Sequence, residues 1–206
     1  MPLKLLGIST SPRREGNSDL LLREALTAAE RAGATVEYLR LCDYRIEGCS
    51  ECYACSEQDA CPMTDDYQTL LDKMLDVDRL VLATPVFFMA VSAQAKLLID
   101  RGQCLWLRKN VKGRPLFDPP RDRRGIMIAV GGSKGRRQFN CVRKPIQGFF
   151  QYLEVECVGR LFINQVDEKG AILDRTDALE HAGRLGRELV GTPGLSTDRP
   201  MDLELF

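Results

Sequence analysis

Short apolar runs and amphipathic stretches alternate along the whole chain of 206 residues. Five apolar runs predict β-strands, and they lie at residues 3–8, 34–41, 79–84, 125–130 and 155–163. After each run, apolar residues recur at intervals of three and four, which predicts helices at residues 19–31, 65–76, 92–105, 143–152 and 176–190. Strands that are apolar on both faces and separated by helices indicate a parallel sheet covered by helices on both sides.

This order of elements predicts an α/β fold of the flavodoxin-like, doubly wound type, with five parallel strands in the order 2-1-3-4-5. We predict one domain over residues 1–190 and a C-terminal tail over residues 191–206, where prolines and glycines interrupt the pattern. In such a sheet, ligands bind at the carboxyl ends of the strands beside strand 1. The loops at residues 9–18, 84–91 and 131–137 should therefore meet at one site.

The first of these loops, with the sequence STSPRREGNS at residues 9–18, joins a strand to the start of a helix. It offers hydroxyls, a guanidinium, an amide and free backbone N–H groups, which together suit a phosphate group. It lacks the Gly-Lys-Ser/Thr of a Walker loop and the three glycines of a dinucleotide-binding fingerprint. These absences favour a single monophosphate, as in FMN, over ATP or a dinucleotide. The alternative is a polar turn that only caps the helix.

The other two loops offer a surface for a flat ring. Residues 84–89 have the sequence TPVFFM, which leaves the end of a strand with apolar and aromatic groups. Gly131 and Gly132, followed by Ser133, allow backbone to approach a ligand closely because glycine has no Cβ atom. Core packing of the two phenylalanines and a ligand-free glycine turn are the alternatives.

Charge and cysteine usage narrow the function classes. The chain has 29 Lys and Arg against 29 Asp and Glu, so nothing in its net charge favours nucleic acid or an anionic membrane as a partner. No apolar run reaches the ~18–20 residues of a membrane-spanning helix, and we expect a cytoplasmic protein. Eight cysteines are then unexpected, because that compartment keeps thiols reduced. Four of them are scattered along the chain, and we expect them to be small packing residues: Cys42, Cys104, Cys141 and Cys157.

The other four cysteines are concentrated in the cysteine loop, residues 49–63, which follows the second predicted strand. Their spacing is Cys49-x2-Cys52-x2-Cys55-x5-Cys61, with Pro62 next. The spacing is close to the ferredoxin run C-x2-C-x2-C-x3-C-P with its last spacer lengthened by two residues. It favours a [4Fe-4S] cluster. A four-thiolate zinc site stays open, although zinc sites commonly pair two separated knuckles, and so do reduced or transiently oxidised thiols.

Three segments together resemble the iron–sulfur flavoproteins of the NADPH-dependent FMN reductase-like, flavodoxin-fold family. They are GISTSPRREGNSDLLL, ATPVFFMAVSAQAKLLIDR and the cysteine run, and the resemblance covers most of residues 1–165. It implies FMN at the sheet edge, a [4Fe-4S] cluster on the cysteine loop, and a homodimer or homotetramer in which clusters and flavins approach each other across subunits. Two positions depart from the common family pattern: Thr10 stands where Gly is frequent, and Phe87 where Tyr is common.

The resemblance also implies particular site residues. Around the FMN phosphate it places Ser9, Ser11, Arg13, Asn17 and Ser18. Along the ribityl chain and the ring it places Thr84, Pro85, Val86, Phe87 and Phe88, with Gly131, Gly132 and Ser133 near the other edge of the ring. As cluster ligands it places Cys49, Cys52, Cys55 and Cys61. Asp100 and Arg101 match a stretch near the dimer interface of relatives and read as structural.

These features predict a flavin-dependent oxidoreductase that has no catalytic side chain of its own, since the chemistry belongs to the cofactors. We expect electrons to pass through the cluster and FMN between a donor, ferredoxin or NAD(P)H, and a small-molecule acceptor. One alternative is an NAD(P)H-dependent FMN or quinone reductase whose cysteine loop is structural, as a zinc or thiol site. Another is a non-enzymatic redox or iron sensor.

Basic residues cluster at 121–124, 134–137 and 143–144. They could dock an acidic ferredoxin, because complementary charge speeds encounter. They could instead hold the 2′-phosphate of NADPH. Plain solvated surface charge is the third interpretation.

Overall fold

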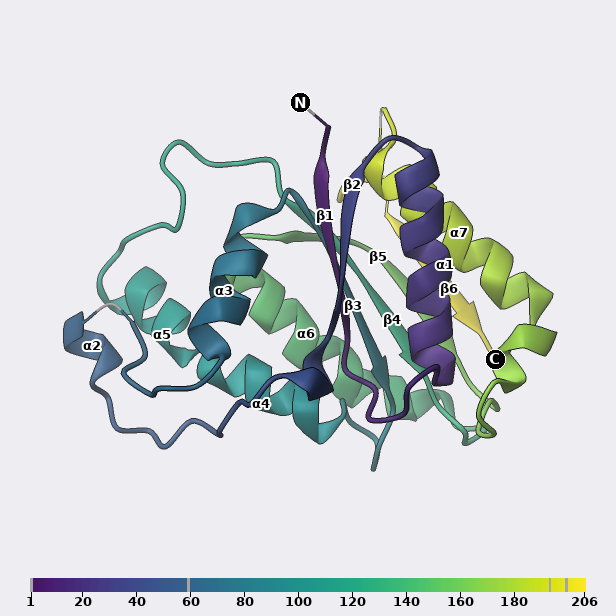
Figure 1. The fold of residues 1–206 in the computed structure, drawn as a ribbon, viewed down its shortest axis with the longest axis horizontal. Coiled ribbons are helices and arrows are strands. Elements are labelled where there is room, and N and C mark those ends of the chain that lie inside the picture. The colour runs from purple at the N-terminus through teal and green to yellow at the C-terminus, as the bar shows by residue number, and fades with distance from the viewer. Residues whose placement is uncertain (1, 59, 193, 199) are drawn as a thin grey trace.

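The computed structural model describes residues 2–58, 60–192, 194–198 and 200–206. Its centre is a six-stranded parallel sheet in the order β2-β1-β3-β4-β5-β6 (Figure 1). The strands are β1 (Lys4–Ser9), β2 (Thr35–Arg40), β3 (Arg79–Pro85), β4 (Arg124–Val130), β5 (Glu156–Ile163) and β6 (Met201–Leu205). The chain leaves β1 toward β2 and then returns to the other side of β1 to form β3, so the order reverses between β1 and β3.

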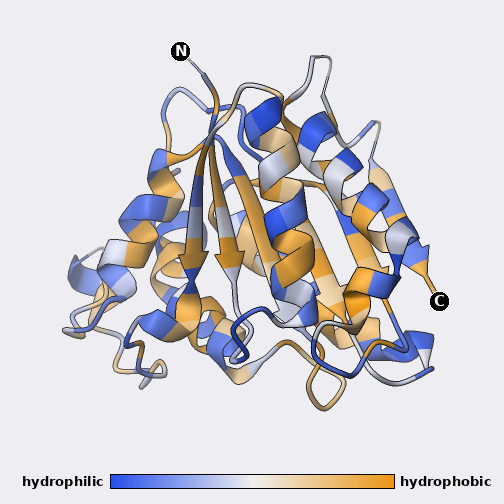
Figure 2. Cartoon of the chain, turned by 45° about the vertical axis from the view of Figure 1, so that its right-hand side comes forward, coloured by the Kyte–Doolittle hydropathy of each residue, from blue (hydrophilic) through white to orange (hydrophobic). Residues whose placement is uncertain are grey.

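Helices cover both faces of the sheet, and Figure 2 shows their apolar sides turned toward it. The helices α1 and α7 lie on one face, and α3, α4, α5 and α6 lie on the other (Figure 1). Their bounds are α1 (Asn17–Arg31), α2 (Cys55–Gln58), α3 (Tyr67–Asp76), α4 (Ala93–Arg101), α5 (Gln103–Trp106), α6 (Asn140–Tyr152) and α7 (Thr176–Val190). Single turns lie at η1 (Leu41–Asp43), η2 (Leu107–Val111), η3 (Arg136–Phe139) and η4 (Ala171–Asp174). No helix in the described part of the chain is long and apolar enough to cross a membrane.

The contact between α1 and α7 depends on a glycine. A Cβ atom on Gly186 would lie 1.9 Å from the Ala25 carbonyl oxygen, closer than any real Cβ contact. The two helices can therefore approach only because position 186 has no side chain. This approach seals one face of β1 and β3, whose loops carry the candidate site.

The predicted doubly wound fold and its strand order are confirmed, but the prediction of five strands is wrong by one. Residues 201–205, placed in the predicted tail, form β6 beside β5. The sequence MDLEL alternates apolar and acidic residues, which is typical of a half-buried edge strand. Ion pairs from Arg160 to Asp202 and from Arg143 to Glu204 attach the acidic face of β6 to the body of the protein. Only five residues carry this pattern, which is too short a signal to predict a strand from the sequence.

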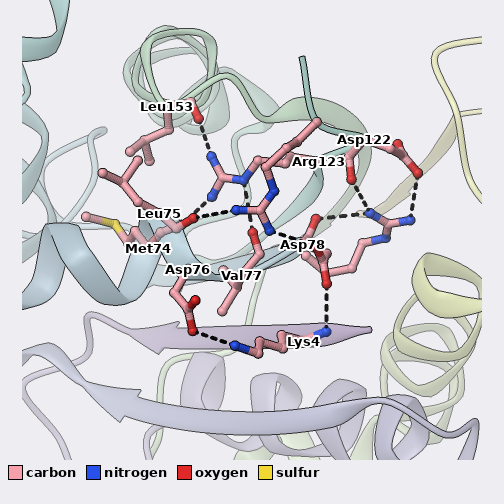
Figure 3. Close-up of polar contacts among 11 residues, drawn as sticks. Lys4, Met74, Leu75, Asp76, Val77, Asp78, Asp122, Arg123 and Leu153 are labelled. Atoms are coloured by element: carbon pink, nitrogen blue, oxygen red, sulfur yellow. Dashed lines mark hydrogen bonds and ion pairs between the residues drawn. The ribbon is translucent and has the colours of Figure 1, made fainter. Parts of the chain in front are cut away.

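The arginines of the 121–124 stretch lie where β4 begins, at the amino-terminal edge of the sheet, and the three predicted site loops follow the carboxyl ends of the strands. Figure 3 shows Arg123 among its partners. The Arg123 side chain is 2% exposed and donates to the carbonyls of Met74, Val77 and Leu153. Arg121 pairs with Asp78 at 2.9 Å. Arg123 is therefore neither a docking residue nor a ligand of a 2′-phosphate, and it joins the ends of α3 and α6 to β4.

Candidate functional site

The loops after β1, β3 and β4 meet at the carboxyl edge of the sheet, the lower edge in Figure 1. The Thr10 N–H donates to the Ala83 carbonyl at 2.9 Å, and the Val86 N–H donates to the Val130 carbonyl at 2.8 Å. The second and third loops share a shallow pocket of about 420 Å³. Its lining residues are Val86, Phe88, Met89, Gly132, Ser133, Gln138 and Asp167. The structure thus brings together the three loops that the sheet topology predicted to converge.

Two buried hydroxyls at the β1–α1 connection have no hydrogen-bond partner within the part of the chain that the structure describes. They belong to Ser9, which ends β1, and to Ser18 in the first turn of α1. An unsatisfied buried polar group costs about 1–3 kcal/mol, so its presence calls for a missing partner. The first turn of α1 also presents free N–H groups and the positive end of the helix dipole. This combination fits a phosphate group.

Ser11 and Arg13 shape the same loop. The Ser11 hydroxyl oxygen accepts the Arg13 N–H at 3.2 Å, which closes a tight turn. A Cβ atom on Gly16 would lie 2.7 Å from Ser11 Oγ, so the loop folds closely on itself. The exposed Arg13 guanidinium donates to the Asp167 carbonyl at 3.3 Å. Ser11 therefore sets the backbone of the loop, and Arg13 extends along its outer side.

Asn17 connects the loop to a fourth segment that the sequence reasoning missed, residues 165–172 after β5. Its amide Nδ2 donates to the Glu168 carbonyl at 2.8 Å, and its Oδ1 accepts the N–H groups of Gly170 and Ile172 at 3.0 and 3.4 Å. The structure thus uses the Asn17 side chain to position backbone. The sheet topology could have predicted this segment as part of the site, because it follows a parallel strand and must lie at the same edge.

Thr84 belongs to a buried hydroxyl network beneath the site. Its Oγ1 accepts the Ser92 N–H at 3.1 Å and donates to the Pro85 carbonyl at 2.9 Å. The Ser92 hydroxyl in turn donates to Thr10 Oγ1 at 3.0 Å, or to the Thr10 carbonyl at 2.9 Å. The network links the ends of β1 and β3 to the start of α4. Thr84 and Thr10 therefore hold the loops in place from below.

The tip of the β3–α4 loop is a strained, apolar turn. Phe87 and Ala90 exchange two backbone hydrogen bonds of 3.0 Å, and the two residues between them, Phe88 and Met89, have φ angles of 47° and 65°. Left-handed conformations are unfavourable for bulky residues, and such strain clusters at functional sites. The side chains of Phe87, Phe88 and Met89 are all exposed. Phe88 and Met89 line the pocket, and Phe87 lies next to them in the turn.

Gly131 and Gly132 allow two side chains to approach the backbone after β4. A Cβ atom on Gly131 would lie 2.1 Å from Gln138 Oε1, and one on Gly132 would lie 2.8 Å from Asp167 Oδ1. Gln138 is buried and donates from Nε2 to the Ser133 carbonyl at 2.8 Å. Gln138 and Asp167 are thus parts of the pocket wall that residue spacing alone did not reveal.

The four cysteines of the cysteine loop line a second pocket, of about 460 Å³, to which α4, α5 and α6 also contribute residues. All four are free thiols; Cys49 and Cys52 are exposed, and Cys55 and Cys61 are half-buried. Helix α5 adds a fifth thiol, the buried Cys104, to the lining. Within the described ranges, no three cysteine, histidine or carboxylate side chains already stand in position to hold a metal ion. Binding one would require the thiols to draw together.

Local hydrogen bonds and burial shift the pKa values of two loop thiols in opposite directions. The pKa of Cys52 is lowered because the Ala54 backbone N–H and the Ser50 hydroxyl stabilise its thiolate. The pKa of Cys55 is raised by burial and by the neighbouring Cys61 thiol. The thiolate is the form that binds metal. A metal cation would reverse the penalty at Cys55, since it neutralises the charges that the thiols place near one another.

Arg101 closes the base of the cysteine loop. Its guanidinium donates to the Asp65 carboxylate at 2.5 and 3.2 Å and to the Glu47 carbonyl at 3.1 Å. Glu47 and Asp65 flank the loop on its two sides. The structure places Arg101 beside the cysteines, where these contacts are structural, as predicted. Its position relative to a subunit interface stays a prediction.

Residues 3–160 match the family described as NADPH-dependent FMN reductase. The chain belongs to this family. It is 37% identical over 157 residues to an iron–sulfur flavoprotein of Methanocaldococcus jannaschii, with 76% of each chain covered. It is 30% identical over 153 residues to an iron–sulfur flavoprotein of Methanosarcina thermophila, with 74% of each covered. The resemblance predicted from the three sequence segments is confirmed.

Solved structures of the same fold include other oxidoreductases. An NAD(P)H:quinone oxidoreductase from Methanothermobacter marburgensis superposes with a TM-score of 0.70 at 19% identity, covering 93% of this chain and 98% of that one. At this identity the likeness shows the fold alone. Membership of the FMN reductase family makes the chain a flavin-dependent oxidoreductase. The unpaired buried hydroxyls of Ser9 and Ser18 fit the phosphate of FMN at the carboxyl edge of the sheet.

Replacing Ser18 by alanine should weaken FMN binding about ten- to a hundredfold, because a hydrogen bond to a charged group contributes roughly 1.5–3 kcal/mol. Flavin fluorescence titration of the apoprotein measures this loss. Riboflavin, which lacks the phosphate, serves as the matched ligand, and its affinity should change little. Equal losses for FMN and riboflavin would show that Ser18 does not act on the phosphate.

Proposed function

We propose that this FMN reductase family member transfers electrons between a donor, a ferredoxin or NAD(P)H, and a small acceptor, through FMN and a [4Fe-4S] cluster held by Cys49, Cys52, Cys55 and Cys61. The observation that carries the proposal is the grouping of these four free thiols around one pocket of a flavin-binding fold. Their ferredoxin-like spacing and the names of the two curated relatives support iron over zinc.

The donor set fits an iron–sulfur cluster in kind. Four thiolates supply the full ligand complement of a cubane, and no histidine or carboxylate is needed. Glu51 and Tyr53, between the ligands, have φ angles of 55° and 59°, so this backbone is strained while the thiols stand apart. We expect ligation and folding of the loop to be coupled.

For the flavin, we propose that Ser9, Arg13, Ser18 and the first turn of α1 hold the phosphate. Ser11, Asn17 and Thr84 would position the loops that surround it.

The pocket between Val86 and Ser133 would receive the flavin ring, with Phe87 and Phe88 at its mouth. When bound, FMN exchanges one or two electrons and the cluster exchanges one, so the pair couples a two-electron reaction to single-electron transfers. The side chains around them bind, orient and exclude water.

The two pockets have no lining residue in common, and α2 lies well away from the β1–α1 loop (Figure 1). We therefore propose that the protein works as a homodimer or homotetramer, in which the cysteine loop of one copy approaches the flavin of another. The exposed apolar turn at Phe87–Met89 is suited to such a contact, since large apolar side chains gain most from being covered.

The decisive test is metal, sulfide and flavin analysis of anaerobically purified protein together with its absorbance spectrum. We expect about four iron and four sulfide per chain, and one FMN. Zinc in place of iron, or no metal with full FMN, would overturn the proposal.

The second candidate is an NAD(P)H-dependent FMN or quinone reductase with a structural cysteine loop. The separation of the thiols in the structure is the observation that favours it. In that case NAD(P)H alone should bleach the bound flavin, and removal of a loop thiol should leave the bleaching rate unchanged.

A further inference from the structure

A buried ion pair lies directly beside the cysteine loop. The side chains of Arg101 and Asp65 are 1% and 2% exposed, and the Arg101 guanidinium lies over the Tyr67 ring, 4.6 Å from its centroid. Asp65 also accepts the N–H groups of Glu47 and Tyr67, at 2.9 and 3.0 Å. The pair therefore ties together the residues before and after the cysteine loop and the end of α4.

One nitrogen of Arg101 makes no hydrogen bond to the residues that the structure describes. Its Nη1 and Nη2 atoms are occupied by Asp65 and Glu47, but its Nε–H is buried and has no partner among the residues that the structure describes. A guanidinium presents its donors in one rigid plane, so a single arginine can bridge a carboxylate on one side and another acceptor on the other. Buried donors generally have an acceptor, so this Nε–H is free to bind one that the described residues do not supply.

The surroundings indicate what this acceptor is. Arg101 lines the same pocket as Cys61 and Cys104. The Cys61 side chain interacts electrostatically with the Arg101 guanidinium, so the two groups are close to each other. Sulfur atoms that carry negative charge accept N–H donors, and such hydrogen bonds set the reduction potential of iron–sulfur centres. A buried cation next to the fourth cysteine is placed to do this.

We propose that Arg101 is a positioning residue for the cluster site, which closes the base of the cysteine loop through Asp65 and donates its Nε–H to a sulfur of the Cys61 side of the cluster. This inference rests on the cluster ligation proposed above. Reduction adds one negative charge to the cluster, and a fixed buried cation stabilises the reduced form more than the oxidised form. Arg101 should therefore raise the reduction potential, while Asp65 partly offsets it.

The test compares the cluster midpoint potential in four anaerobically prepared variants, measured by dye-equilibrated electron paramagnetic resonance. Arg101→Gln should shift the reduction equilibrium at least tenfold toward the oxidised cluster, a fall of about 59 mV for a one-electron couple. Arg101→Lys, which keeps the charge, should restore most of the potential. Asp65→Asn should move it in the opposite direction. Lys96→Gln removes an exposed charge from the same helix and should leave it unchanged.

Iron content per chain and thermal unfolding are recorded for every variant, because loss of the ion pair also loosens the loop. A purely structural role would lower the iron content or the melting temperature of Arg101→Gln while the retained clusters keep the wild-type potential, and that result overturns the inference. A fall in potential for Asp65→Asn would overturn it as well. If the wild-type protein holds zinc or no metal, the proposed function fails first, so the two failures are distinguishable.

Discussion

Replacing Cys55 by alanine should reduce the iron and sulfide content of the protein from about four of each to none, while FMN binding persists. Cys55 begins α2 at the centre of the cysteine loop, and its thiol is half-buried in the pocket that it shares with Cys61. A cubane cluster takes four thiolate ligands, so the loss of one should destabilise it. The flavin loops lie at another edge of the protein, so their structure should not change.

The measurement is iron, sulfide and flavin analysis of anaerobic protein, followed by electron transfer from reduced ferredoxin to a quinone. Cys157→Ala is the matched control, because Cys157 is also a half-buried thiol but lies at the start of β5. It should retain both cofactors and full electron transfer. A Cys55→Ala protein that keeps four iron atoms, or one that loses FMN as well, contradicts the proposed ligand set or its separation from the flavin site.

Much of the fold follows from local patterns in the chain. Helix α7 spans the residues predicted from its apolar spacing, Thr176–Val190, and β3 and β4 were predicted to within one residue. The central strands are apolar on both faces, which only a sheet covered on both sides can satisfy. Strand order came from the general preference for doubly wound topology. The edge strand β6 was not predicted because it lies outside the repeating strand–helix pattern.

The location of the site could be predicted from the sheet topology. The hydrogen-bond partners of its side chains could not, because they depend on distant segments. The carboxyl ends of parallel strands meet by geometry, so the convergence of the three loops needed no knowledge of side chains. Whether an amide such as that of Asn17 faces a ligand or a backbone depends on a loop 151 residues away, at Glu168. Likewise, the Thr84 hydroxyl accepts a hydrogen bond from the Ser92 N–H. The residues next to Asn17 or Thr84 in the sequence do not predict either contact.

Arg101 illustrates the same limit at the cysteine pocket. The spacing of the four cysteines is a local signal, and the sequence reveals it directly. The ion pair of Arg101 with Asp65 spans 36 residues, and the thiol of Cys104 comes from a different helix. Both become visible only when α4 and α5 pack against the loop. The sequence therefore predicts the ligands of a compact motif. The groups that would set the properties of the bound cluster can be identified only from the tertiary structure.

Arg123→Met should lower the free energy of unfolding by about 3 kcal/mol or more, which corresponds to a fall in melting temperature of roughly 6–12 °C for a protein of this size. Arg123 donates to the carbonyls of Met74, Val77 and Leu153, and the substitution leaves these three oxygens buried without their donor (Figure 3). Burial lowers the pKa of Arg123 to about 10, so the guanidinium is still charged at neutral pH. Denaturant unfolding at a fixed FMN concentration measures the loss.

Arg121→Gln provides the control two residues away. Arg121 is 36% exposed and pairs with Asp78 at the surface, where such pairs contribute about 0–1 kcal/mol. Its loss should therefore cost far less than that of Arg123, although both substitutions remove one positive charge from the same stretch. Equal effects of the two would mean that the stretch acts through its net charge. A large effect confined to Arg123, with FMN binding intact, would show that the arginine joins α3 and α6 to the amino edge of the sheet, far from the chemistry at the opposite edge.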